Sequence, residues 1–279
     1  MIERPWMSAI RRSHIIQPIQ NDPRTNPPGS LFGWSMSDAY RVGIENGQAD
    51  FDAPVGNLYP RDRALLYAYL NQQRHLDELT HALGAMTNGD LLSLRNATVF
   101  DVGCGPFTGG LAVGMILDGI YPFHYIGIDR ARSMQTLGGV LAAAAKATGG
   151  LNHGTSVEFL DNLTHYQRTG PPRGTWTIAL VCYLLASPTL DVDAMASSIV
   201  SACNRNGPGP ASVICLNSAA AIANSRFGEF SARMTALGFE SQVAESERFT
   251  DTRSAQKEIH YALFHRPENN IVDNTGRTP

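Results

Sequence analysis

From residue 98 onward, short apolar runs alternate with longer stretches in which apolar residues recur at helical spacing. Runs of the first kind indicate strands buried on both faces, and stretches of the second kind indicate helices. This alternation predicts an α/β fold with a mostly parallel sheet covered by helices on both faces. Two of the predicted strands end at Asp101 and at Asp129, and three more span residues 156–160, 176–183 and 211–216. The predicted helices span residues 108–118, 133–148, 190–204 and 225–237.

The pattern changes character near the carboxyl end. Residues 240–249 and 257–265 both have the character of strands, and only a short polar link joins them. Antiparallel strands tolerate such short connections, whereas parallel strands need a crossover. We therefore expect a seven-stranded sheet that ends in an antiparallel hairpin, followed by a flexible polar tail at residues 267–279.

The first 60 residues lack a sustained period and contain several prolines, so we expect short helices only, for example at residues 37–46. Aromatic residues such as Trp6 and Trp34 argue against a wholly disordered leader. After Pro60, with Asp62 as candidate cap, leucines at helical spacing predict a long amphipathic helix that ends at Gly84. The predicted organisation is an extension or lid over residues 1–60, a domain with its leading helix over residues 61–266, and the tail.

The first two predicted strands of the domain each end in an acid, and two glycines follow the first of these acids. Asp101 is followed by Gly103 and Gly105, and Asp129 ends the next strand. Glycines permit a sharp turn in which the backbone approaches a ligand closely. A carboxylate at the end of such a strand accepts hydrogen bonds from ribose hydroxyls. The pair predicts a site for a nucleoside-containing cofactor at the carboxyl edge of the sheet.

The run Asp101-Val102-Gly103-Cys104-Gly105 resembles the first motif of the class I S-adenosylmethionine-dependent methyltransferases, in which an acid precedes Gly-x-Gly. The resemblance covers residues 98–266. It implies a Rossmann-like sheet, S-adenosyl-L-methionine as cofactor and methyl transfer as activity. A dinucleotide-binding sequence would carry a third glycine where Thr108 stands and would lie near the amino terminus. An NAD-dependent oxidoreductase is therefore less favoured.

Phe107 departs from the family, many members of which carry a glycine at this position. A bulky side chain there would change how the turn meets the methionine end of the cofactor. We expect Thr108, Gly109 and Gly110 to restore the close approach by capping the following helix and leaving its first amides uncovered.

The resemblance also implies roles for residues beyond the first motif. Asp161, after the third strand, is expected at the adenine amino group, although Asp161 and Asn162 would equally form a turn. Tyr183, after the fourth strand, is expected to line the acceptor pocket or to pack under the extension, and Tyr59 either closes the cofactor pocket or acts as an aromatic staple. The candidate cofactor-binding residues are Asp101, Gly103, Cys104, Gly105, Pro106, Thr108, Asp129, Arg130, Asp161, Asn162, Cys182 and Tyr59.

No catalytic residue is assigned from the sequence. The chain lacks the Asn-Pro-Pro-Tyr or Asp-Pro-Pro-Tyr quartet with which members of the family methylate base nitrogens or glutamine, and its eight histidines show no spacing that selects a base or a metal site. Methyl transfer depends largely on proximity and orientation. We therefore expect a small-molecule or protein acceptor, the alternative being a catalytically inactive cofactor-binding protein.

Composition narrows the partners further. The net charge of -3 supplies no broad positive field, so nucleic acid is not favoured as a partner and an RNA methyltransferase is a weaker alternative. The four cysteines lack Cys-x-x-Cys spacing, which favours buried reduced thiols. The longest apolar run, residues 178–186, is far below the ~20 residues of a membrane span. We expect a cytoplasmic protein without a membrane segment or a metal.

Overall fold

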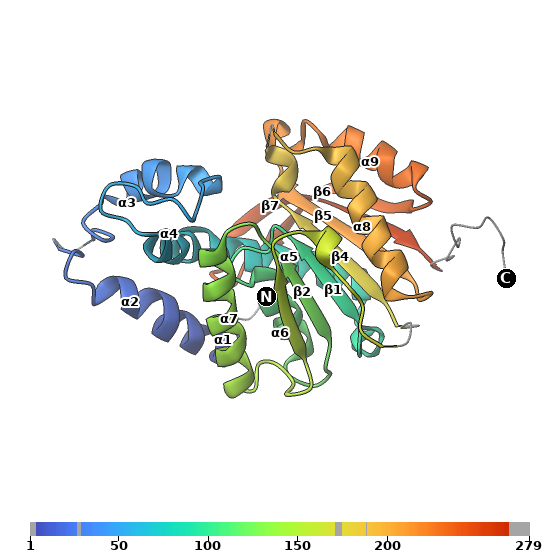
Figure 1. Cartoon of the computed structure of the whole chain (residues 1–279), viewed down its shortest axis with the longest axis horizontal. Coiled ribbons are helices and arrows are strands. Elements are labelled where there is room, and N and C mark those ends of the chain that lie inside the picture. The colour runs from blue at the N-terminus through green and yellow to red at the C-terminus, as the bar shows by residue number, and fades with distance from the viewer. Residues whose placement is uncertain (1–3, 27–28, 171–174, 188, 268–279) are drawn as a thin grey trace.

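One seven-stranded sheet forms the centre of the computed structural model, which describes residues 4–26, 29–170, 175–187 and 189–267 (Figure 1). The predicted tail therefore lies outside the described residues, apart from Pro267. The strands are β1 (Thr98–Val102), β2 (His124–Ile128), β3 (Ser156–Leu160), β4 (Thr177–Cys182), β5 (Ala211–Ser218), β6 (Glu240–Thr250) and β7 (Gln256–Arg266).

The strand order is β3-β2-β1-β4-β5-β7-β6. β1 pairs in parallel with β2 and β4, whereas β7 is antiparallel to both β5 and β6. β1 and β4 are buried along nearly their whole length, as their apolar sequences predict. The prediction of a mostly parallel sheet with a terminal antiparallel hairpin is confirmed. It is the Rossmann-like arrangement that the resemblance to class I methyltransferases implies.

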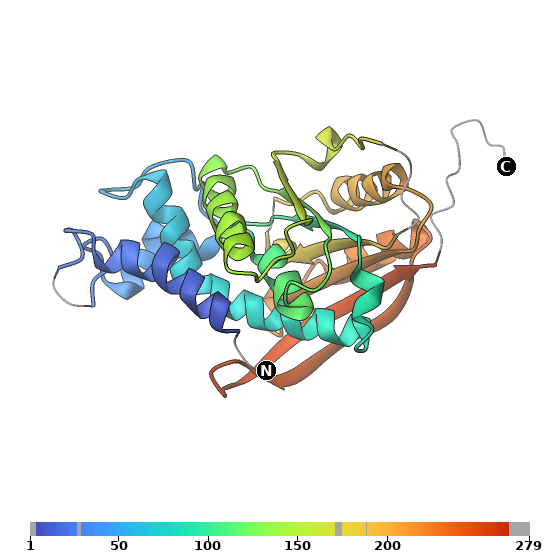
Figure 2. The same cartoon turned by 90° about the horizontal axis from the view of Figure 1, so that it is seen from below.

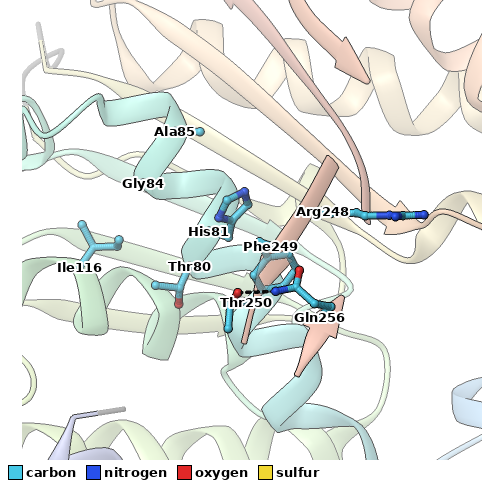
Figure 3. Close-up of a pocket in the computed structure, with 9 residues that line it drawn as sticks. All are labelled: Thr80, His81, Gly84, Ala85, Ile116, Arg248, Phe249, Thr250 and Gln256. Carbon is cyan, nitrogen blue, oxygen red and sulfur yellow. Dashed lines mark hydrogen bonds between the residues drawn. The ribbon is translucent and has the colours of Figure 1, made fainter. Parts of the chain in front are cut away.

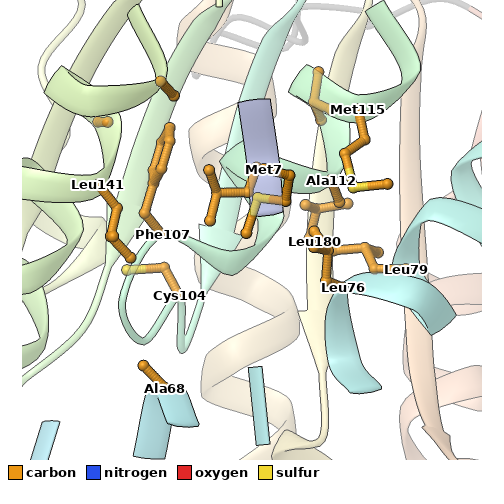
Figure 4. Packing of buried hydrophobic residues seen from close by; sticks show 14 of the residues in the cluster. Met7, Ala68, Leu76, Leu79, Cys104, Phe107, Ala112, Met115, Leu141 and Leu180 are labelled. Carbon is orange, nitrogen blue, oxygen red and sulfur yellow. The ribbon is translucent and has the colours of Figure 1, made fainter. Parts of the chain in front are cut away.

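Helices cover both faces of this sheet (Figures 1 and 2). The apolar core beneath one helical layer includes Met7, Phe107 and Leu180 (Figure 4). Met7 belongs to the N-terminal extension, so the extension contributes to the core of the domain. The helices on that face are α5 (Gln73–Thr87), α6 (Thr108–Leu117) and α7 (Arg132–Ala147), and those on the other are α8 (Val192–Asn206) and α9 (Phe227–Ala236).

The direction of winding reverses between β1 and β4. The chain leads from β1 outward through β2 to β3 and then returns to β4 on the other side of β1. Connections on the two sides diverge at such a switch point and leave a crevice beyond the carboxyl ends of the strands. The topology thus places a binding site where the glycine turn leaves β1.

The extension contains a longer helical run than predicted. α1 (Pro5–Arg11) continues through a π-helical turn at Arg12–Ile16 into α2 (Gln17–Gln20). The expectation of short helices only is wrong here. Pro5 occupies the first turn, where its missing N–H has no partner to lose. Pro18 follows the π-helical turn. There the Gln17 N–H donates to the Arg12 carbonyl, five residues back instead of four, so the proline stands where the regular helical hydrogen bonding is already interrupted.

The other predicted helices of this region are present with changed ends. Residues 36–47 form α3 (Met36–Asp38) and two short helical turns. The leading helix consists of α4 (Pro60–Tyr67), a π-helical turn at Ala68–Gln72, and α5, which continues past Gly84. Asp62 is not its cap, since Tyr59 holds that position. Instead the Asp62 carboxylate accepts from the Tyr59 N–H at 3.0 Å and from the Arg24 guanidinium at 2.8 Å.

Arg63 on α4 anchors the loop of the extension. Its side chain is only 2% exposed and donates to the carbonyl oxygens of Gly43, Asp50 and Ala53 at 2.6–2.7 Å. Glu45 adds an ion pair at 3.0 Å. Burying a guanidinium is costly unless acceptors surround it, and all of these acceptors belong to residues 43–53 of the loop. The loop is therefore held in place by this one side chain.

Replacing Arg63 with methionine should therefore loosen the loop without unfolding the sheet. Three carbonyls lose their donor, at a cost of about 1–3 kcal/mol for each that stays buried. We expect amide hydrogen exchange in residues 43–53 to accelerate at least tenfold, while β1 and β4 keep their protection. Arg61→Met, at an exposed neighbouring position, is the matched control. Equal exchange in the two variants would contradict the anchoring role.

Candidate functional site

The glycine turn after β1 requires backbone conformations that glycine adopts readily. Gly103 and Gly105 have φ of 72° and 50°. A Cβ on Gly103 would lie 2.7 Å from Cδ2 of Leu184, so a side chain here would collide with the loop that follows β4. The turn also receives support from the leading helix, since the buried Gln72 amide donates to the Pro106 carbonyl at 2.9 Å.

Asp101 lies beneath this turn and is 3% exposed. Its Oδ2 accepts from the Gly109 N–H at 3.1 Å and from the Tyr125 hydroxyl at 2.7 Å. Burial raises the pKa of Asp101 to about 6. A Cβ on Gly109 would lie 2.3 Å from the same oxygen, so only glycine allows α6 to begin this close to the carboxylate. Asp101 therefore joins β1, β2 and the first turn of α6.

Phe107 has a backbone conformation that glycine adopts more readily than other residues do. Its φ is 69°, and its ring is fully buried among apolar residues (Figure 4). The ring contacts Tyr125, with the ring centroids 4.7 Å apart. A Cβ on Gly110 would lie 2.0 Å from that ring. The bulky side chain is thus turned into the core. The prediction that Thr108 caps the helix is wrong, because Phe107 is the N-cap, without a side-chain hydrogen bond, and Asp101 accepts from the first turn instead.

Asp129, at the end of β2, connects two turns. Its Oδ2 accepts from the Gly105 N–H and its Oδ1 from the Ala131 N–H, both at 2.9 Å. Burial raises the pKa of Asp129, and the two amides oppose that effect. Each oxygen keeps a second lone pair, so the carboxylate can still accept from a ligand.

A cavity of about 470 Å³, here called the switch-point cavity, opens at the carboxyl ends of β1, β2 and β4. Tyr59 lies outside its lining, with 68% of its surface exposed, and Asp101 and Cys104 are buried below the turn. Pro106, Thr108 and Asn162 are also absent from the lining described. The predicted residues that line the cavity are Gly103, Gly105, Asp129, Arg130, Asp161, Cys182 and Tyr183.

The extension supplies the wall opposite the strands. Gly47, Gln48, Ala49 and Phe51 line the switch-point cavity. The next residue, Asp52, accepts from the first amides of α7, those of Arg132 and Ser133, at 2.8 and 2.9 Å. Although burial favours the neutral acid, these hydrogen bonds lower the pKa of Asp52. The Ser133 hydroxyl donates to the Phe51 carbonyl at 2.9 Å, so a capped helix holds the wall in place.

An aromatic and charged cluster beside the cavity was not predicted from the sequence. Tyr67 and Tyr183 line the cavity, and the His75 ring stacks on Tyr183 with centroids 4.0 Å apart. The Tyr67 hydroxyl lies 3.4 Å from His75 Nδ1. The Tyr183 hydroxyl donates to buried Glu78, which pairs with Arg74 at 2.9 Å.

The electrostatics of this cluster favour neutral rings beside the ion pair of buried Glu78 with the half-exposed Arg74. Burial, aided by the charge of Arg74, lowers the pKa of His75 to about 3, so its imidazole is neutral near pH 7. Burial and the charge of Glu78 raise the pKa of Tyr183. Tyr183 also has a φ of 62°, a strained conformation of the kind found at functional sites. A histidine eight residues after Tyr67 carries no local signal, because the π-helical turn between them sets their relative direction.

Asp161 lies at the rim of the switch-point cavity. Its side chain is 68% exposed and its Oδ1 lies 2.7 Å from Nδ1 of His165. The hydrogen bond with His165 lowers the pKa of Asp161, which leaves a carboxylate able to accept from an amine. Asn162 accepts from the Thr164 N–H at 2.9 Å, as expected for the turn that its sequence also allows.

One groove on the molecule contains none of the predicted residues. This groove of about 660 Å³ lies between α5 and the end of β6, where His81 stacks on Phe249 (Figure 3). Among the described residues, no three His, Cys, Asp or Glu side chains gather as a metal site would require. Nor does any helix in the described ranges have the length and apolar character needed to cross a bilayer. Cys104, Cys203 and Cys215 are buried thiols.

Comparison with known proteins finds no matching protein-family model and no matching curated protein. Solved structures resemble the chain weakly. An S-adenosylmethionine-dependent methyltransferase from Methanosarcina mazei has a TM-score of 0.42 at 14% identity, over 63% of this chain and 95% of that one. A second such methyltransferase, from Aquifex aeolicus, has a TM-score of 0.42 at 11% identity, over 70% of this chain and 93% of that one. An arsenic(III) S-adenosylmethionine methyltransferase from Chlamydomonas reinhardtii has a TM-score of 0.40 at 13% identity, over 67% of this chain and 72% of that one. The functional conclusion rests on the geometry of the cavity.

The pKa of Asp101 makes a prediction about stability. Because this pKa is raised from 3.8 to about 6 on folding, Asp101 contributes stability that is present below its unfolded pKa and is lost as the pH rises through about 6. Between about pH 4.5 and about pH 7.5 the wild type should lose ~2 kcal/mol of unfolding free energy relative to Asp101→Asn. Urea unfolding of both proteins at several pH values measures this. A difference that stays constant with pH would show that Asp101 does not titrate in this range.

Proposed function

We propose that this protein is an S-adenosyl-L-methionine-dependent methyltransferase that acts on a small-molecule or protein acceptor. The observation that carries the proposal is the junction of Asp129 with the glycine turn at the switch point, facing a cavity. Ligands of α/β sheets bind at this place, and a carboxylate there suits a ribose. The cavity of about 470 Å³ lies within the range of small-molecule sites.

The residues present fit an adenosyl group. Gly103 and Gly105 line the cavity without side chains of their own, and Asp129 has lone pairs free for the two ribose hydroxyls. The carboxylate of Asp161 would accept from the exocyclic amine of adenine. Asp101 would act from below, as a positioning residue that fixes the turn.

The acceptor would occupy the part of the cavity formed by Tyr67, Tyr183, Leu184, Leu190 and Met195. When bound, the cofactor supplies a methyl group on a positively charged sulfur. The side chains on this wall are largely apolar and aromatic, so they would exclude water and orient an acceptor. Orientation of this kind supplies a large part of the rate in transfer reactions.

The two alternative interpretations have less support. Phe107 in the turn would be consistent with an inactive cofactor-binding protein, but its ring is buried in the core and does not line the cavity. An oxidoreductase with an all-parallel sheet is disfavoured by the antiparallel β6–β7 hairpin. We accordingly favour an active enzyme, with nucleic acid as the less favoured acceptor.

Titration with S-adenosylhomocysteine tests the cofactor site. The wild type should bind it, and Asp129→Ala should bind it at least ~100-fold more weakly, because two hydrogen bonds to a charged group are lost. Asp129→Asn, which keeps one acceptor oxygen, should show an intermediate loss. Asp90→Ala, at the exposed acid that caps the short helical turn after α5, is the control. Undiminished binding by a folded Asp129→Ala variant would place the cofactor elsewhere.

Transfer itself is tested with S-adenosylmethionine that carries a labelled methyl group. The protein is incubated with cell extract, which is then separated into protein, RNA and metabolite pools. We expect label in the protein or the metabolite pool, and none with Asp129→Ala. Label confined to RNA would overturn the proposed acceptor class, and binding of the cofactor without label in any pool would favour the inactive alternative.

A further inference from the structure

A second cavity, here called the three-helix cavity, lies where the helical run of the extension, α4 and α7 meet. Its volume is about 620 Å³. The three elements lie side by side in both views of the molecule (Figures 1 and 2). Its apolar wall is formed by Pro18, Ala64, Leu65, Leu137 and Val140. Val140 remains 44% exposed, so this wall is only partly covered by the protein itself.

Positive charge surrounds this apolar wall. Arg61 and Arg132 line the cavity, and neither guanidinium forms an ion pair or a hydrogen bond within the described ranges. His14 also lines this cavity. Asp52 is the one acid among the described lining residues, and both of its oxygens already accept from amides of α7.

The other polar groups of the lining are satisfied within the protein. The hydroxyl of Ser13 donates to the Ala9 carbonyl, and that of Thr136 donates to the Arg132 carbonyl. Ser133 donates to the carbonyl of Phe51. The donors left for a ligand are therefore the two guanidinium groups, with the imidazole of His14 next to them.

We propose that the three-helix cavity binds a small carboxylate with an apolar body, such as a medium-chain fatty acid. A guanidinium matches the two oxygens of a carboxylate, and the apolar wall matches a hydrocarbon chain. Two guanidinium groups and one aspartate leave a single positive charge among these three residues. That balance complements a monoanionic carboxylate better than a dianionic phosphate.

This site is separate from the switch-point cavity and does not depend on the proposed methyl transfer. Phe51 lines the switch-point cavity, whereas Asp52, the next residue, lines the three-helix cavity. No described lining residue is common to the two cavities, although this segment of the extension, α4 and the first turn of α7 contribute to both walls.

Calorimetric titration with decanoate tests the proposal on the full chain. Decanol has the same chain without the charge, decyltrimethylammonium carries the opposite charge, and acetate lacks the chain. We expect decanoate to bind at least tenfold more tightly than each of the three. Equal binding of decanoate and decanol, or no binding of decanoate, would overturn the proposal. Tighter binding of decyl phosphate than of decanoate would overturn the choice of a carboxylate.

Variants locate the binding site. Arg61→Gln and Arg132→Gln should each weaken decanoate binding about tenfold, since each removes one charged hydrogen-bond donor. Arg95→Gln, at an exposed position outside the cavity, should leave it unchanged. Val140→Glu and Val140→Lys alter the same exposed position with opposite charges. We expect the glutamate to abolish binding and the lysine to preserve it. Equal effects of these two variants, or wild-type affinity in both arginine variants, would show that the cavity is not an anion site.

Discussion

The structure of the candidate site depends on one buried carboxylate. Asp101 has almost no contact with solvent, and a charge in such a position is costly unless donors surround it. Its two donors come from different elements, the hydroxyl of Tyr125 on β2 and the first turn of α6. The carboxylate therefore fixes a strand, its neighbour and the following helix relative to one another. The glycine turn projects from this junction, and Asp129 then joins it to the next turn.

Side-chain size around Asp101 follows from the same constraint. Gly109 and Gly110 have no Cβ because the Asp101 carboxylate and the Phe107 ring already occupy the space. Phe107 shows how the chain departs from a glycine-rich pattern without closing the cavity. Its backbone keeps a positive φ, at a cost of about 1 kcal/mol, and burial of the ring offsets that cost by roughly 2 kcal/mol. A large residue in a ligand-binding turn is thus no argument against binding when its side chain points into the core.

The sequence predicted the parts of the fold that local pattern determines. The strands, the terminal hairpin and the positions of Asp101 and Asp129 follow from apolar runs and turn residues that lie close together in the chain. The helical run across Pro18 was missed because a π-helical turn changes the register just before the proline. The cluster of Tyr67, His75 and Tyr183 was missed for a related reason. Its members meet through a second π-helical turn and a loop after β4, and no short-range pattern records that contact.

Besides the apolar contacts of residues such as Met7 with the core, polar interactions fix the extension to the domain at three points. Arg63 gathers its loop, Arg24 bonds Asp62 at the start of α4, and Asp52 caps α7. Each of these interactions involves a residue of α4 or α7, the two helices of the domain that line the three-helix cavity together with the helical run of the extension. The wall of the switch-point cavity is therefore positioned by the same helices that would contact a ligand in the other cavity. Any ligand that displaced α4 relative to α7 would also move Phe51, and thermodynamic linkage would then couple the two cavities in both directions.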